Sequence, residues 1–254
     1  MSGAVAAAMR FAAPAKLNLF LHVTGRRADG FHDLETVFRL IDLNDEIDIA
    51  VREDGRIVRD PPPADPVLAA LPDDADLTVR AARLLQQRAG VGQGASIHVH
   101  KRIPAGGGLG GGSSDAATVL RALIELWNLN WPLERLAGLG LELGSDVPVF
   151  VHGRNAFASG RGEVLTPVDL PPRWYLVVHP GIAVATGEVF ADPLLTRESL
   201  PLTIRALPPD GGRNDCEPVV RARHPEVAEA LDRLAAPGAR LTGTGACLFT
   251  ESTT

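Results

Sequence analysis

Six glycines occupy the seven positions 106–112, within the segment PAGGGLGGGSS that covers residues 104–114. Glycine lets the backbone adopt positive φ and come close to a ligand without a side chain in the way. The segment leads directly into an apolar stretch that predicts a helix over residues 115–127. Free amides at a helix N-terminus favour a bound anion. The pattern therefore indicates a phosphate-binding loop, with Ser113 and Ser114 as helix caps or as hydroxyl ligands of a phosphate or a magnesium ion.

Other interpretations of this loop can be weighed from the sequence. A Walker A loop ends in Gly-Lys-Ser/Thr, whereas here Gly112 is followed directly by Ser113. The GxGxxG spacing is present, but a dinucleotide-binding fold requires a strand after the helix. The residues after Trp127 read NLNWPLERLAGLGLEL and predict a second helix instead. A flexible linker would seldom adjoin so apolar a helix. Of these interpretations, a phosphate-binding loop of another type agrees best with the sequence.

The composition narrows the class of protein. With 254 residues and 45% hydrophobic content, the chain can form one large or two modest globular domains. A net charge of -6 disfavours nucleic acid and anionic membranes as partners, although an anionic nucleotide stays possible. Cys216 and Cys247 form no CxxC pair, and no signal peptide or membrane-spanning stretch is evident. We therefore expect a soluble, cytoplasmic protein with no disulfide framework and no residue assigned as a metal ligand.

Two of the 25 basic residues are lysines, Lys16 and Lys101. A compact ammonium group cannot always be exchanged for a wide guanidinium, so these positions are candidates for a site that needs the smaller cation. Chance retention in an arginine-biased chain explains each lysine about equally well.

The hydrophobic pattern predicts helices at 77–88, 115–127, 133–143 and 225–235. It predicts strands at 17–23, 36–41, 45–51 and 95–101, with strand or buried segments at 147–151, 156–158 and 174–179. Loops are expected at 25–32 and 60–76, and a glycine turn at 240–248. Strands followed by helices and then by a second mixed unit indicate an α+β fold with two domains, residues 1–165 and 166–254.

Several motifs resemble those of one enzyme family. PAGGGLGGGSSDAA resembles the second motif of the GHMP kinases, whose glycine-rich loop wraps the phosphates of ATP. APAKLNLFLHVTGRRADGFHDLETVF resembles the first motif, in the form found in kinases of cytidine diphosphate methylerythritol, and LTGTGACLF resembles the third. LGSDVPVFVHGRNAFASGRGE and WYLVVHPGIAVATGEVF fit the same kinases, so the resemblance runs in order along nearly the whole chain.

The resemblance implies the two-domain GHMP kinase fold. Residues 1–165 would form a domain like the second domain of ribosomal protein S5, and residues 166–254 a ferredoxin-like domain. The chain stops at LFTESTT, soon after the third motif, where the resembling enzymes continue. The second domain is therefore expected to lack its last helix and strand.

The implied activity is phosphorylation of the 2-hydroxyl of cytidine diphosphate methylerythritol, in the non-mevalonate route to isoprenoid precursors. ATP would be the phosphoryl donor, and Mg²⁺ is expected with it. Asp146 corresponds to the catalytic aspartate that takes the hydroxyl proton, and Lys16 to the lysine that keeps Asp146 ionised and offsets charge on the phosphoryl group. From spacing alone, Asp146 could instead cap the helix that begins near Pro148.

The resemblance also assigns binding residues. ATP would be held by Pro104, Ala105, Gly106, Gly107, Gly108, Leu109, Gly110, Gly111, Gly112, Ser113 and Ser114, with Lys101 and Asp76 beside the adenosine. Asp76 stands where the family usually has Asn, so it can accept from the adenine amino group but cannot donate to a ring nitrogen. The small-molecule substrate would be bound by Asn18, Phe31, His32, Thr186 and Phe190.

The cytidine contacts each have a competing explanation. His32 offers a donor and an acceptor to a cytosine edge, but a lone loop histidine is more often simply solvated. Phe31 replaces a tyrosine that is frequent in the family, which keeps stacking on the base and loses any hydroxyl contact. Phe190 could stack on the opposite face or belong to the core.

Two alternatives to this activity stay open at the level of sequence. Another GHMP kinase could act on homoserine, mevalonate or a sugar. The GRRADGFH loop disfavours this alternative, because recognition of cytidine would account for the loop. A non-catalytic ligand-sensing relative is disfavoured because Lys16, Asp146 and the glycine loop are all present.

Overall fold

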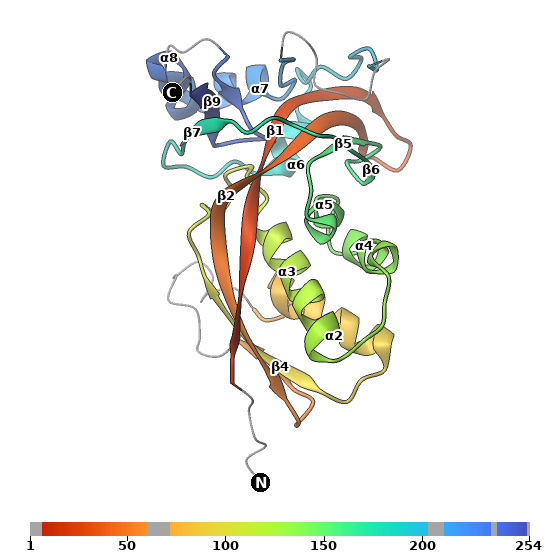
Figure 1. The fold of residues 1–254 in the computed structure, drawn as a ribbon. Helices are drawn as coiled ribbons and strands as arrows, with labels where there is room; N and C mark the ends of the chain where they lie inside the picture. Colours follow the sequence, from red (N-terminus) through yellow and green to blue (C-terminus); the bar gives the residue numbers. More distant parts are fainter. Residues whose placement is uncertain (1–6, 60–71, 203–210, 235–237, 253–254) are drawn as a thin grey trace. The chain divides into compact units, whose positions relative to one another are not determined.

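The computed structural model describes residues 7–59, 72–202, 211–234 and 238–252 (Figure 1). The chain divides by contacts into two compact units, neither of them continuous in sequence. Unit 1 contains residues 1–15, 42–103 and 111–153, and unit 2 contains residues 16–41, 104–110 and 154–254. The division falls inside the two longest strands and inside the glycine-rich segment. We predict a single domain boundary at residue 165, which divides the chain into two segments that are each continuous in sequence. This boundary stays a prediction.

Unit 1 is a sheet with helices on one side (Figure 1). Its strands are the first part of β1 (Met9–Arg26), the last part of β2 (His32–Arg52), β3 (Ile57–Arg59) and β4 (Gly94–His100). β2 pairs antiparallel with β4, from Glu46 opposite His100 to Arg52 opposite Gly94, and β3 joins β4 in parallel. The helices are α2 (Leu77–Ala89), α3 (Gly111–Leu126), α4 (Leu133–Leu141) and α5 (Val147–His152). Alternating residues of β2 and β4, such as Ile47, Ile49 and Ile97, are buried in the core.

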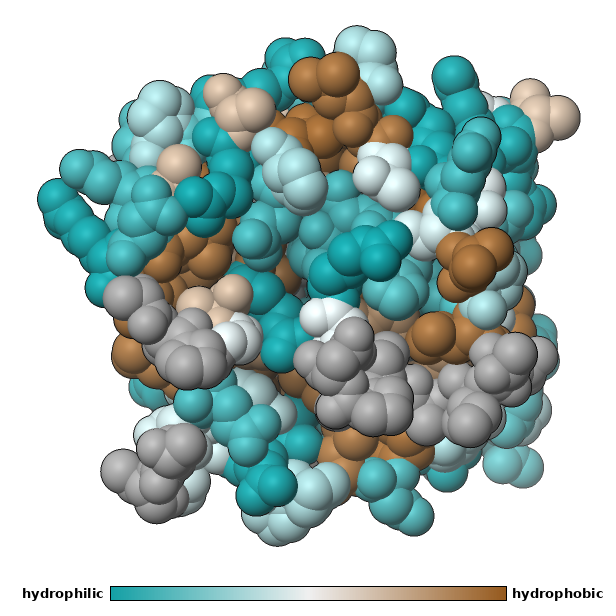
Figure 2. All heavy atoms as spheres, turned by 90° about the horizontal axis from the view of Figure 1, so that it is seen from above, coloured by the Kyte–Doolittle hydropathy of each residue, from teal (hydrophilic) through white to brown (hydrophobic). Residues whose placement is uncertain are grey.

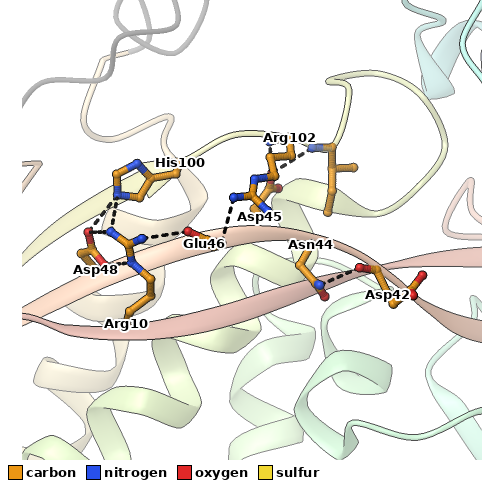
Figure 3. A network of polar contacts seen from close by, with 9 residues as sticks. Arg10, Asp42, Asn44, Asp45, Glu46, Asp48, His100 and Arg102 are labelled. Carbon is orange, nitrogen blue, oxygen red and sulfur yellow. Dashed lines mark hydrogen bonds and ion pairs between the residues drawn. The ribbon is translucent and has the colours of Figure 1, made fainter.

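Charged side chains on three strands of unit 1 are joined through Arg10 (Figure 3). Its guanidinium donates to Asp48 at 2.7 Å and to Glu46 at 2.9 Å, and Nε2 of His100 lies 2.8 Å from Asp48. The hydrogen bond from Arg10, helped by the one from His100, holds the pKa of Asp48 below its usual range. Because Arg10 is exposed and its partners are partly exposed, we assign these groups a part in strand register rather than much stability.

Unit 2 contains the other parts of β1 and β2 and two sheet regions. β2 pairs with β5 (Ala156–Ser159), which pairs with β6 (Val164–Pro167). A separate sheet has the order β7 (Trp174–Val178), β9 (Leu248–Ser252), β8 (Arg240–Leu241). The helices are α6 (Thr186–Ala191), α7 (Glu217–Arg223) and α8 (Pro225–Leu234). Their apolar faces share one core, which includes Val23, Val189, Val220, Leu231, Leu241 and Leu248.

Most predicted elements are confirmed, with three corrections. The strands predicted at 36–41 and 45–51 are one strand, β2, because no glycine or proline interrupts the polar residues between them. The segment 147–151 is helix α5 and not a strand; a short apolar run fits either, and here Gly153 in the left-handed conformation ends a helical turn. Helix α3 begins at Gly111, four residues earlier than predicted. Of the predicted loop at 60–76, residues 60–71 lie outside the described part of the chain.

The surface mixes polar and apolar residues. Figure 2 shows the molecule from above the view of Figure 1, with brown apolar groups set apart among teal polar residues. Isolated exposed apolar side chains are ordinary on a protein surface. Among the helices that the structure describes, none is long and apolar enough to cross a membrane.

Candidate functional site

The ammonium group of Lys16 is buried in unit 2, against the backbone of the glycine loop. The residue is 2% exposed, and Nζ donates to the carbonyl oxygen of Gly108 at 2.9 Å and to Oδ1 of Asn18. The main-chain N–H of Lys16 also donates to the carbonyl of Leu109 at 2.9 Å. A buried cation is stable only when polar groups surround it. The fold therefore keeps one of the two lysines where a phosphate-binding loop would need a positive charge.

The side chain of Asn18 forms hydrogen bonds with Lys16 and with strand β2. Its Nδ2 donates to Oγ1 of Thr36 at 2.9 Å, and its main-chain N–H donates to Oγ1 of Thr242 at 2.9 Å. The side chain is 3% exposed. These bonds fix the amide so that its oxygen faces Lys16, whereas contact between Asn18 and a substrate stays a prediction.

The first half of the glycine loop packs on the turn between β8 and β9, within unit 2. The carbonyl of Gly106 accepts from the main-chain N–H groups of Val184 at 3.3 Å and Ala246 at 3.2 Å. The carbonyl of Gly107 accepts from Cys247 at 3.0 Å. At Gly108, where φ is +72°, a Cβ atom would overlap the carbonyl oxygen of Thr242. Glycine is thus required here by close backbone packing as well as by conformation.

The second half of the segment, in unit 1, forms the start of α3. Ser113 and Ser114 lie in the first turn and do not cap it, because the helix already begins at Gly111. The first amides of a helix have no internal acceptor, so this turn presents donors to an anion. Oγ of Ser114 is buried and, among the described residues, has no hydrogen-bond partner. A hydroxyl in this position suits a phosphate or a hard cation.

The ammonium group of Lys101 is partly buried and lies between two carboxylates of unit 1. Its Nζ donates to Asp115 at 2.9 Å and to Asp45. Asp45 also accepts from the main-chain N–H groups of Arg102 at 2.5 Å and Ile103 at 2.8 Å (Figure 3). Burial works against the charge, but the carboxylates of Asp115 and Asp45 raise the pKa of Lys101. Both lysines of the chain therefore donate to oxygen acceptors.

Asp146 occupies the N-cap position of α5 without acting as its cap. Its backbone has φ -85° and ψ -12°, and the side chain makes no hydrogen bond to the first helical amides. The capping role that spacing allowed is therefore wrong. Lys16 and Asp146 belong to different units, so their pairing stays a prediction.

Asp76 is the N-cap of α2. Oδ1 accepts from the main-chain N–H groups of Thr78 at 2.8 Å and Val79 at 3.4 Å, and Arg59 lies 3.4 Å from the other oxygen. Asp and Asn cap helices about equally well, so an Asn at this position could cap α2 in the same way. The adenine contact of Asp76 stays a prediction.

Two of the predicted substrate-binding residues, His32 and Phe190, contact each other in unit 2. The ring of His32 stacks on that of Phe190 with centroids 5.1 Å apart. Phe31 is 51% exposed, with the guanidinium carbon of Arg161 4.5 Å from its ring centroid. A ring that is half exposed suits base stacking. Thr186, the first residue of α6, shares a hydrogen bond of 2.9 Å with Thr244.

Three residues that bond to predicted site residues were not found from sequence. Asp45 anchors Lys101, Thr242 bonds Asn18, and Arg197 donates to His32 at 3.1 Å. Asp45 lies in an acidic strand, IDLNDEIDI, and the sequence does not distinguish it, as a buried residue, from the other acidic residues of that strand. Arg197 follows an irregular stretch, and its contact partner is distant in the chain. Thr242 lies in the third motif, which predicts the glycine turn but assigns no role to this side chain.

Two family models match the chain: "GHMP kinases N terminal domain" over residues 76–154 and "GHMP kinases C terminal" over residues 198–254. A 4-diphosphocytidyl-2-C-methyl-D-erythritol kinase of Pseudomonas paraeruginosa (strain DSM 24068 / PA7) is 56% identical over 238 residues, which cover 93% of this chain and 83% of the relative. The protein of the same name from Pseudomonas entomophila (strain L48) is also 56% identical, over 93% of this chain and 82% of its own.

Solved structures agree with these relatives. A crystal structure of 4-(cytidine 5'-diphospho)-2C-methyl-D-erythritol kinase matches with a TM-score of 0.80 and 36% identity, covering 95% of this chain and 89% of that one. Mevalonate kinase of Methanococcus jannaschii matches with a TM-score of 0.66 and 16% identity, covering 97% and 91%. The second match shows a shared fold only.

Proposed function

The chain belongs to the GHMP kinases, within the family of 4-diphosphocytidyl-2-C-methyl-D-erythritol kinases, and we infer that it transfers the γ-phosphoryl group of ATP to the 2-hydroxyl of that substrate. The resemblance carried by the three motifs and the mixed α and β fold are both confirmed. The products would be the 2-phosphate and ADP, in the non-mevalonate route to isoprenoid precursors. The alternative acceptors homoserine, mevalonate and sugars are not favoured, since relatives at 54–56% identity carry the cytidine-bearing name.

The observation that best supports phosphoryl transfer is the contact between Lys16 and Gly108. It fixes a buried cation on the loop whose shape and glycines suit the phosphates of ATP. We propose that Lys16 offsets charge on the transferring phosphoryl group and that Asp146 accepts the proton of the attacking hydroxyl. Because the transition state of phosphoryl transfer is loose, positioning by these groups would matter as much as proton removal.

We propose that ATP is bound with Mg²⁺, which would neutralise phosphate oxygens when present. The hydroxyl of Ser114, buried in the first turn of α3, is a suitable oxygen ligand. The described residues contain no cluster of three or more His, Cys, Asp or Glu side chains that could hold a metal. The ion would therefore be held mainly by the nucleotide, with Ser113 or Ser114 completing its ligands.

Two free buried thiols, Cys216 and Cys247, and a substrate that is a water-soluble nucleotide support a cytoplasmic location. We propose no nucleic-acid or membrane partner.

The activity is tested by measuring ADP release with 4-diphosphocytidyl-2-C-methyl-D-erythritol, homoserine and mevalonate in parallel, each at matched concentration with ATP and Mg²⁺. We expect turnover with the first substrate and only background release with the others. Equal or faster turnover of homoserine or mevalonate would rule out the proposed substrate.

A further inference from the structure

The ring of His32 is held by one aromatic contact and one hydrogen bond, both inside unit 2. The residue is 8% exposed, and its ring stacks on Phe190 at an interplanar angle of 26°. Nε of Arg197 donates to Nε2 of His32 at 3.1 Å. Arg197 also donates to the main-chain oxygens of Phe190 at 3.0 Å, Asp192 at 2.6 Å and Leu195 at 3.0 Å. Four acceptors therefore fix the orientation of this guanidinium.

The chemistry of arginine determines which nitrogen of His32 carries the proton. A guanidinium has only N–H donors and stays charged at any physiological pH. The nitrogen that faces it, Nε2, must therefore offer a lone pair, and the proton of the neutral ring lies on Nδ1. Burial, and then the charges of Arg197 and Arg26, lower the pKa of His32, which agrees with a neutral ring. Within the described residues, Nδ1 has no hydrogen-bond partner.

We propose that Arg197 is a positioning residue that fixes His32 as a hydrogen-bond donor through Nδ1–H, and thereby sets the preference of the site for cytosine over uracil. This proposal rests on the proposed function, because it assumes that the base of the substrate meets His32. It also changes the expectation from sequence, in which His32 offered both a donor and an acceptor. The acceptor is used internally by Arg197, and the donor alone is left for the ligand.

The selection follows from the edges of the two bases. Cytosine presents acceptors at N3 and O2, whereas uracil carries a hydrogen on N3. A fixed Nδ1–H group can donate to N3 of cytosine, whereas it faces the N3–H donor of uracil. Two donors that face each other lose both hydrogen bonds, so we expect a preference of about tenfold or more for the cytidine substrate. A histidine free to exchange its tautomer could serve either base.

The tautomer can be measured from the ¹⁵N chemical shifts of the His32 ring in the ligand-free protein, without reference to any substrate. At pH 7 we expect a protonated Nδ1 and an unprotonated Nε2. Arg197→Met removes the donor and the nearby charge, so the proton should redistribute to Nε2 and the ring should titrate at higher pH. A ring with its proton on Nε2, or with both nitrogens protonated, in the unaltered protein at pH 7 would overturn the proposal.

Kinetics then test the consequence for specificity. The ratio of kcat/KM for the cytidine substrate to that for its uridine analogue should fall about tenfold in Arg197→Met, mainly through KM, with kcat little changed. Arg197→Lys keeps one donor and should restore part of the ratio. Arg221→Met removes another arginine of unit 2, one paired with Asp232 at 2.7 Å, and should change neither the ring spectrum nor the ratio.

The outcomes separate the two proposals. An unchanged specificity ratio in folded Arg197→Met contradicts the role of Arg197. If Arg197→Met fails to fold, the spectrum of the unaltered protein and the ratio in Arg197→Lys decide the question. If the unaltered protein turns over neither nucleotide substrate, the proposed function fails, whereas the ring spectra still show whether Arg197 fixes the tautomer.

Discussion

The Nζ atom of Lys101 lies 2.9 Å from the carboxylate of Asp115, so that one ion pair joins the residues on either side of the glycine-rich segment. Asp45 completes the group by accepting from the same ammonium. Two carboxylates thus share a single, partly buried cation. The other oxygen of Asp115 is buried and, in the part of the chain that the structure describes, has no hydrogen-bond partner. One carboxyl group of this cluster should therefore protonate easily, and burial raises the pKa of Asp115 to about 7 despite the nearby Lys101.

This cluster predicts a pH-dependent stability that Asp115→Asn removes. A carboxyl whose pKa rises from 3.8 to about 7 on folding binds its proton more tightly in the folded state. Its stabilising contribution is present at low pH and is lost as the pH rises through about 7. The free energy of unfolding of the unaltered protein, compared with that of the variant, should therefore fall between pH 5 and pH 8. Urea titrations at several pH values measure the difference.

Asp54→Asn provides the control for this experiment. The hydrogen bond from Arg52 lowers the pKa of Asp54 to about 2, so this group does not titrate between pH 5 and pH 8. Its effect on the free energy of unfolding should be the same across that range. If Asp115→Asn also gives a constant difference, the Asp115 carboxyl is not protonated near neutral pH.

Gly108→Ala is expected to disrupt the glycine loop. The added Cβ would overlap the carbonyl of Thr242 and lie 3.0 Å from that of Gly245, at a positive φ that alanine rarely adopts. We expect a loss of about 2 kcal/mol or more in the free energy of unfolding, together with weaker ATP binding. Denaturant unfolding and a nucleotide-binding titration measure the two effects.

Gly138→Ala is the matched control for the glycine loop, since no atom lies within 4 Å of a Cβ built at this exposed position of α4. Alanine in a helix should stabilise the protein by about 0.5–1 kcal/mol. Similar stability of Gly108→Ala and the unaltered protein would show that the loop can move away from the turn.

Asp76→Ala should destabilise the protein through loss of a helix cap. The carboxylate accepts from Thr78 and Val79 at the start of α2 and faces Arg59. Replacement by alanine should cost about 1 kcal/mol in the free energy of unfolding, whereas Asp76→Asn should cost much less because asparagine caps equally well. Thermal or denaturant unfolding distinguishes the two variants. Equal losses in both would mean that the charge of Asp76, and not its capping oxygen, stabilises the helix.

The sequence predicted those parts of the protein whose cause is local. The glycine run, the helix α2 and the hairpin loop that ends at His32 depend on neighbouring residues, and each was found. The apolar run 147–151, predicted as a strand or a buried segment, is buried but forms helix α5, because five residues cannot distinguish a strand from a buried helix. The early start of α3 at Gly111 was missed because glycine is a poor helix former.

The site was predicted through motifs, and its supporting residues were not. Lys16, Asn18 and His32 lie in the first motif, but Arg197, which orients His32, acts through a contact that the fold creates. Arg197 lies 165 positions from His32 in the chain, and the sequence around either residue does not predict their contact. Motifs indicate which chemistry is present, whereas tautomers and ion pairs depend on tertiary neighbours.

Lys16→Met and Asp146→Asn should each lower kcat by on the order of 10²-fold or more, with the fold intact by circular dichroism. Methionine keeps the length of Lys16 without its charge, and asparagine keeps the shape of Asp146 without its basicity. Lys16→Arg should also lose activity, because a guanidinium is too wide for a position that is 2% exposed. The exposed Asp169→Asn should keep full turnover. If Lys16 and Asp146 act as one unit, the double variant should lose little more than either single one. Losses that multiply would instead show that the two residues act independently, and full activity in either single variant would contradict its role.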